Sequence, residues 1–138
     1  LVGSEMCIRD SCYRSGRTPD WYLRQLNGHK HLIIGNHDKA TLDCENAAKY
    51  LESVEKMQHV TDEDKQICLC HYPLAEWYKS RHGSWLIYGH IHGARDEVYE
   101  FMKTRERALN AGACINNYTP VSFNELVRNN KAFQEKDS

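Results

Sequence analysis

Five side chains of types that bind transition metals stand directly after short apolar runs of this chain. They are Asn36, His37, His71, His90 and His92. The runs that precede them read HLII (31–34), ICLC (67–70) and WLIY (85–88). A short apolar run between turn residues is typical of a buried strand, and functional groups gather beyond the carboxyl ends of parallel strands. We therefore predict that these side chains converge at one rim and bind a divalent metal, because imidazole and amide oxygen suit such ions.

The first of these loops reads GNHD (35–38). Gly35 has no Cβ, which allows the chain to turn off the strand close to a ligand. Asn36 offers a neutral oxygen as a metal ligand, and the adjacent His37 should point elsewhere and act as a general acid or contact an oxyanion. Asp38 could hold an imidazole in orientation. A simple turn is the alternative, since Gly-Asn is common turn chemistry.

The third loop reads GHIHG (89–93). In an extended segment His90 and His92 lie on the same face, where they could bind one metal or two neighbouring metals. The alternative is a pair of surface histidines in a glycine-rich loop. His71 stands alone after its strand, and a lone histidine is more often structural than a ligand, so its assignment depends on the other two loops. The remaining four histidines are expected to be exposed, and no function is assigned to them: His29, His31, His59 and His82.

The elements that must position these loops alternate between strands and helices, which favours α/β layers over a β-sandwich or a helical bundle. Strands are expected at 30–34, 66–70 and 85–88, and helices at 19–26, 43–52, 74–81 and 123–130. The stretch 97–102 is ambiguous between helix and strand, and 109–115 reads as a strand with a turn. Thr18 predicts the start of the first helix, and Ser122 with Glu125 forms a capping box at the start of the last.

The composition fits one globular domain of 138 residues with a net charge of −1 and a pI near 6.8. That charge gives no general attraction to nucleic acid or to anionic membranes. No apolar stretch approaches the roughly 20 residues that cross a bilayer, so we expect a cytoplasmic protein. The six cysteines include no C-x-x-C pair. Cys68 and Cys70, on a predicted buried strand, are expected to be reduced core residues.

Several motifs together resemble those of the calcineurin-like metallophosphoesterases. GNHD, a strand ending in His-Tyr-Pro, and GHIHG occur here in the order of that superfamily. Longer segments are similar to a small predicted-phosphoesterase branch of it: LNGHKHLIIGNHD, LCHYPLAEWY, HGSWLIYGHIHG and the closing NAGACINNYTPVSFNEL. The resemblance runs from about residue 20 to residue 127, and it is specific because several motifs agree.

The resemblance implies a two-sheet α/β/β/α sandwich with a binuclear metal centre at one rim. It implies that Asn36, His71 and His90 bind one metal and that His92 binds the other. His37 would contact the scissile phosphate and protonate the leaving oxygen, while a metal-bridging hydroxide attacks phosphorus. The two divalent ions would be manganese first, with iron, zinc or nickel as alternatives. The substrate would be a small phosphorylated compound such as a nucleotide, with no membrane or nucleic-acid partner.

The chain departs from that family at its amino-terminal side. The Asp-x-His and Gly-Asp motifs, which supply carboxylate ligands there, do not occur here. The string VGSEMCIRDS resembles translated sequencing-adapter read-through. We therefore expect residues 1–11 to be non-native, 12–130 to form the carboxyl-terminal part of one metallophosphoesterase domain lacking its first strands, and 131–138 to fray. Such a fragment, with neutral ligands only, is expected to bind metal weakly and to be nearly inactive.

Two other interpretations stay open. The histidines could bind one structural zinc in a non-catalytic protein, although Asn is an unusual ligand in such a site. The chain could also be a degenerate member of the same fold that acts as a binding module. The choice between monoester and diester substrates, the native metal and the oligomeric state are not determined by the sequence.

Overall fold

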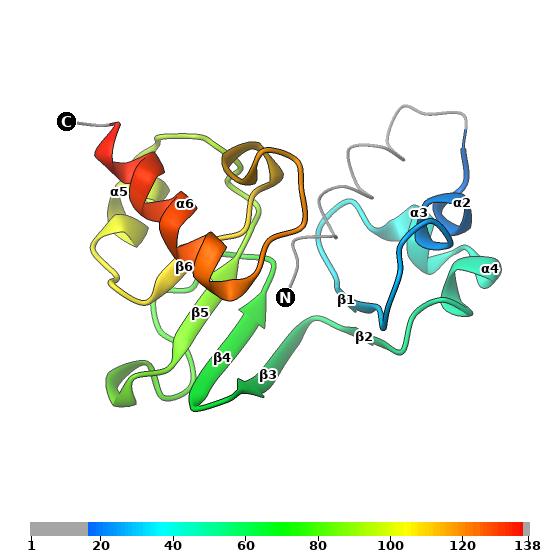
Figure 1. Ribbon diagram of the computed structural model, residues 1–138, viewed down its shortest axis with the longest axis horizontal. Helices are drawn as coiled ribbons and strands as arrows, with labels where there is room; N and C mark the ends of the chain where they lie inside the picture. The colour runs from blue at the N-terminus through cyan, green and yellow to red at the C-terminus, as the bar shows by residue number, and fades with distance from the viewer. Residues whose placement is uncertain (1–16, 137–138) are drawn as a thin grey trace.

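The computed structural model describes residues 17–136 as a mixed α/β protein with two small sheets (Figure 1). The helices are α2 (Pro19–Leu23), α3 (Lys39–Leu42), α4 (Glu45–Ala48), α5 (Glu97–Lys103) and α6 (Phe123–Glu135). The strands are β1 (His31–Ile33), β2 (Ser53–Glu55), β3 (Met57–Asp62), β4 (Lys65–Cys70), β5 (Trp85–Tyr88) and β6 (Ala108–Asn110). Two short 3-10 helices are η1 (Ser80–His82) and η2 (Ala113–Asn116). The predicted α/β class is confirmed. The prediction for residues 1–11 lies outside the described part.

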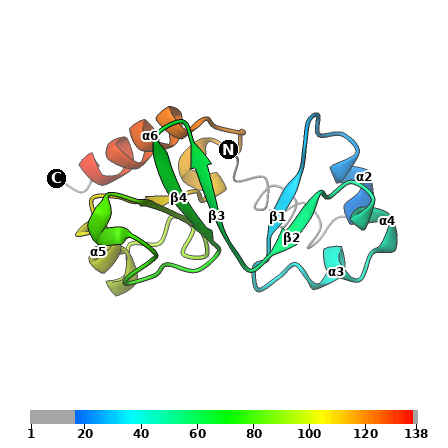
Figure 2. The same cartoon turned by 90° about the horizontal axis from the view of Figure 1, so that it is seen from below.

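The two sheets form two lobes that lie side by side in both views (Figures 1 and 2). In the first lobe, residues 17–55, β1 pairs in parallel with β2 beside the three short helices α2, α3 and α4. In the second lobe, residues 57–136, the strand order is β3-β4-β5-β6. There β3 is antiparallel to β4, whereas β4, β5 and β6 are parallel.

The core of the second lobe covers both faces of its sheet. On one face, Cys68, Leu86 and Tyr88 cluster with Tyr99 and Met102 of α5. On the other face, the buried strand residues cluster with the first turn of α6. Helices on both faces explain why β5 is apolar at every position, since neither face meets water. The prediction that 85–88 forms a buried strand and that Cys68 and Cys70 are core residues is confirmed.

The first lobe is only partly buried. In β1 only Leu32 is buried, His31 is exposed and Ile33 is intermediate. The expectation of a fully buried strand here is therefore wrong, because β1 pairs with β2 alone in the described chain and β2 is itself largely exposed. A separate small cluster of Leu23 and Ala47 holds α2 against α4.

Most predicted elements exist, with several differences. The helix expected at 43–52 is only the four-residue α4, and β2 was not predicted. The segment 74–81 is not a helix: Lys79 adopts a left-handed conformation, and Trp77 Nε1 and Ser84 Oγ bond to backbone carbonyls instead. The hairpin formed by β3 and β4, closed by Glu63, was not predicted. The expected fray at 131–138 is also incorrect for most of that stretch, because α6 continues to Glu135, while 137–138 lie outside the described residues.

The start of α6 could be predicted from the sequence because a local capping box defines it. Ser122 accepts a bond from the backbone of Glu125, and the Glu125 carboxylate accepts one from the Ser122 backbone. This reciprocal capping box satisfies two amides that the helix cannot pair itself. No helix among residues 17–136 has the length and apolar character to span a bilayer.

Candidate metal centre

The parallel strands of the second lobe end at one rim. His71 follows the end of β4, and Gly89 and His90 follow the end of β5. The two strand ends are tied by a bond from the Gly89 amide to the His71 carbonyl, with N···O 2.9 Å. Parallel strands bring their carboxyl ends to the same edge, as expected from the sequence.

His71 joins this rim to the other lobe. Its Nε2 lies 2.9 Å from Oδ1 of Asn36, which is 35 residues earlier in the chain and follows β1. The His71 side chain is 2% exposed. Its ring lies 5.2 Å from that of His90, centre to centre, at an interplanar angle of 70°. The structure thus brings together three of the four residues predicted as ligands.

The fourth predicted ligand, His92, lies in a loop whose shape was predicted incorrectly. His90 and His92 have φ values of 66° and 53°. Both are left-handed, not extended, so the argument that alternation puts them on one face does not hold. Ile91, between them, is buried against Tyr88 in the core cluster. Anchoring Ile91 inward explains why the histidines, and not the flanking glycines, take the unusual conformation.

The GNHD loop is a turn leading into α3. His37 is exposed within this turn. Asp38 is 2% exposed and its Oδ2 accepts the Gly35 amide at 2.6 Å. This bond closes the loop on itself, so the expectation that Asp38 orients an imidazole is replaced by a role in holding the turn. That turn presents Asn36 toward the second lobe.

Sequence reasoning missed Tyr72 as part of the site. Its ring is 4.7 Å from the His90 ring and 4.9 Å from the His71 ring, centre to centre. Tyr72 is nevertheless 45% exposed, so it presents aromatic surface beside the two histidines. Its position directly after His71 was the available signal, since a residue following a rim histidine must lie at the rim.

The donors fit a metal in part. Two ligands bonded to one ion at about 2.1 Å, at right angles, lie about 3 Å apart. The separation of Asn36 Oδ1 from His71 Nε2 matches this spacing. Within residues 17–136, however, no group of three or more His, Cys, Asp or Glu side chains is placed to hold an ion. Asn36 with His71 and His90 therefore forms a neutral partial set, and its metal binding stays a prediction.

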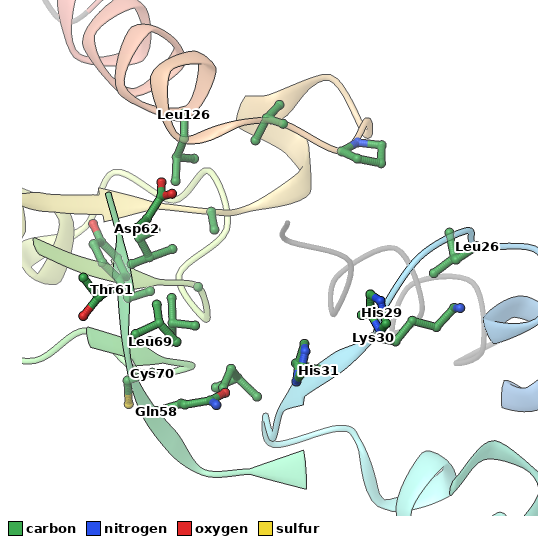
Figure 3. Close-up of a pocket in the computed structure, with 18 of the residues that line it drawn as sticks. Leu26, His29, Lys30, His31, Gln58, Thr61, Asp62, Leu69, Cys70 and Leu126 are labelled. Carbon is green, nitrogen blue, oxygen red and sulfur yellow. The ribbon is translucent and has the colours of Figure 1, made fainter. Parts of the chain in front are cut away.

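A cavity of about 610 Å³ lies between the two lobes (Figure 3). Leu69, Cys70 and Leu126 line it from the second lobe, and His29 and His31 from the first. Both of these histidines are exposed, as predicted.

Both cavity histidines have polar partners on the neighbouring segment. His29 Nδ1 bonds to the carboxylate of Glu52, which lowers the pKa of Glu52, and His31 Nδ1 lies 2.7 Å from Ser53 Oγ. In the core cluster beside α5, burial raises the pKa of the Cys68 thiol to about 11, with a smaller contribution from Cys70. Cys68 therefore stays protonated, as a packing residue should.

The comparisons with known proteins establish similarity without a function. No family model matches the chain. An uncharacterized protein of Methanocaldococcus jannaschii, MJ1445, is 28% identical over 106 residues, which are 77% of this chain and 52% of that protein. The crystal structure of a protein of unknown function from Aquifex aeolicus, AQ665, has a TM-score of 0.61 and 25% identity, covering 84% of this chain and 69% of that one. The chain thus spans about half the length of the curated relative it matches.

Proposed function

We propose that this chain belongs to a metal-dependent phosphoesterase that hydrolyses phosphomonoester or phosphodiester bonds at a binuclear centre. The observation that supports this most is the approach of Asn36 Oδ1 to His71 Nε2 across two lobes, with the His90 ring beside them. Side chains this distant in sequence meet at a strand-end rim, where neutral nitrogen and oxygen donors suit manganese, iron, zinc or nickel.

The proposed roles follow from these positions. Asn36, His71 and His90 would hold one ion, and His92 a second. Two such ions supply an activated water and polarise the phosphoryl oxygens of the substrate. His37 is exposed beside Asn36, so it can reach a bound ester and donate a proton to its leaving oxygen.

We also propose that the two sheets are parts of an α/β/β/α sandwich whose remaining strands and carboxylate ligands belong to a longer protein. The neutral donors Asn36, His71 and His90 support this, because a binuclear centre of this kind would also need carboxylates to offset the charge of its cations. The share of the M. jannaschii relative that the chain covers, 52%, is consistent with it. The 138 residues alone are then expected to bind metal weakly and to turn over substrate slowly or not at all.

The test uses p-nitrophenyl phosphate and its bis-ester as substrates with Mn²⁺. The chain as it stands should show no rate above buffer, whereas the same gene extended upstream should show Mn²⁺-dependent hydrolysis. His71→Ala in the extended protein should abolish it, and His82→Ala, at an exposed residue of η1, should not. An extended protein without metal-dependent turnover on either ester refutes the proposal.

The second candidate is a degenerate binding module of the same fold. It stands beside the first candidate because, among residues 17–136, no group of three or more His, Cys, Asp or Glu side chains is placed to hold an ion. Metal counting on the extended protein separates the cases. Two ions with turnover support the phosphoesterase, one tightly held ion without turnover supports a structural metal site, and no ion supports the binding module.

A further inference from the structure

Two buried asparagines link the last helix to the histidine loop. Asn130 of α6 is 6% exposed and Asn110, the last residue of β6, is 4% exposed. Asn130 Oδ1 accepts the Asn110 amide at 2.8 Å, and Asn130 Nδ2 donates to the Asn110 carbonyl at 3.0 Å. The side-chain amide thus pairs with the edge of β6 as a neighbouring strand would, which fixes Asn110 in place.

The Asn110 side chain in turn forms hydrogen bonds to the loop that carries His92 and to Gly112. Its Nδ2 donates to the His92 carbonyl at 2.7 Å, and its Oδ1 accepts the Gly112 amide at 2.8 Å. Gly112 packs closely against both Asn110 and His92, with no room for a side chain. A Cβ there would lie 3.0 Å from Asn110 Oδ1 and 3.3 Å from the His92 carbonyl oxygen.

The loop needs such support, because its conformation is unfavourable. His90 and His92 both occupy the left-handed region, which residues with a Cβ adopt at a cost and hold only when their surroundings determine it. The bond from Asn110 Nδ2 to the His92 carbonyl joins this loop to the end of β6. Asn110 is therefore placed to hold the backbone from which the His92 ring projects.

We infer that Asn130 and Asn110 act as positioning residues for the His90–His92 loop, holding its two imidazoles in the orientation that metal binding requires. The inference rests on the proposed function for its metal-binding consequence, and it concerns residues that the sequence motifs did not single out. A purely structural pair would stabilise the fold without directing the loop, and this is the alternative that the experiment must separate.

The test is Asn110→Asp in the full chain, with Asn129→Asp as the matched control. Aspartate keeps the acceptor for Gly112 but removes the donor to His92. Asn129 is one residue from Asn130 and bonds to Asn116 instead, with Nδ2···Oδ1 2.9 Å. The intraresidue HN–Hα NOE of His90 and His92, measured without metal, reports the left-handed conformation, because positive φ shortens the distance between these two protons. Co²⁺ titration then reports binding by the metal alone.

Asn110→Asp should weaken the strong intraresidue HN–Hα NOE of His92 toward that of a mobile loop and weaken Co²⁺ binding about tenfold. The control should change neither. An unchanged NOE and an unchanged affinity in a folded Asn110→Asp chain overturn the inference. If that variant does not fold, Gly112→Ala, which displaces the same amide by a few tenths of an ångström, carries the test under the same criteria. If this chain binds no Co²⁺, the titration is made on the protein extended upstream; absence of binding there refutes the proposed function, while the NOE still decides the positioning role.

Discussion

The contact between Asn36 and His71 permits a quantitative test of whether it is a hydrogen bond alone or part of a metal site. The perturbations are Asn36→Ala, His71→Ala and the double variant. The bond length of 2.9 Å and the burial of His71 predict a coupling of about 1 kcal/mol without metal, the usual net value of such a bond. The double-mutant cycle removes the packing that His71→Ala also loses, because that loss appears in both arms.

Metal should add a second and larger effect. An ion present at a hundred times its dissociation constant stabilises the folded chain by about 2.7 kcal/mol. If Asn36→Ala or His71→Ala weakens binding a hundredfold, the same ion concentration contributes only about 0.4 kcal/mol. Each variant should therefore lose about 2 kcal/mol of metal-dependent stabilisation beyond its loss in chelator.

The assay is urea unfolding followed by tryptophan fluorescence, with EDTA and with Mn²⁺ at fixed free concentration. Mn²⁺ is preferred because it binds thiols poorly, which limits its affinity for the unfolded chain and its six cysteines. His82→Ala serves as the control, since His82 is exposed in η1. Equal Mn²⁺ stabilisation in the parent and in both single variants would refute the assignment of Asn36 and His71 as ligands.

Four further predictions concern the fold. Leu86→Ala, at a residue with 0% exposure in the central β5, should lower the free energy of unfolding by about 3 kcal/mol in urea titrations, and a loss under 1 kcal/mol contradicts the described core. Cys68, whose folded pKa of about 11 exceeds its ordinary value of 9.0, should resist alkylation at pH 8 while exposed Cys114 reacts, as peptide mapping can show. Because the unfolded thiol ionises first, Cys68→Ala should flatten the fall in stability between pH 9 and 11. Ser122→Ala should cost about 1 kcal/mol through its bonds with Glu125, measured by thermal unfolding, and no change would argue against the capping box.

The fold was predictable where local pattern and final environment agree. The run 85–88 is apolar throughout because α5 and α6 packing covers both faces of β5, so its bounds follow from the sequence. Ser122 and Glu125 satisfy each other locally, which makes the start of α6 readable without tertiary information. The segment 74–81 failed because long-range contacts decide it: Trp77 bonds to Ser84 and packs on the core, which overrides its helical composition.

The sequence predicted which residues lie at the candidate site better than it predicted the conformation of their loops. Strand-end placement identified Asn36, His71 and His90, and the structure brings them together. The conformation at His92 depends on Ile91 reaching the core and on a bond from Asn110, which is 18 residues away. No short pattern encodes such a contact. The contact of Tyr72 with His90 was missed for the same reason, since His90 follows a different strand, although the position directly after His71 placed Tyr72 at the rim.

The left-handed histidines have a consequence for any redesign of this chain. The left-handed backbone conformation costs a residue with a Cβ about 1–2 kcal/mol, whereas it costs glycine almost nothing. Optimisation for thermal resistance alone would therefore favour replacing His90 and His92, as at the other left-handed positions, although these are the side chains proposed to contact the ions. At these two positions stability favours glycine, whereas the proposed metal binding requires histidine. A variant selected for stability without a functional screen would therefore tend to lose metal binding.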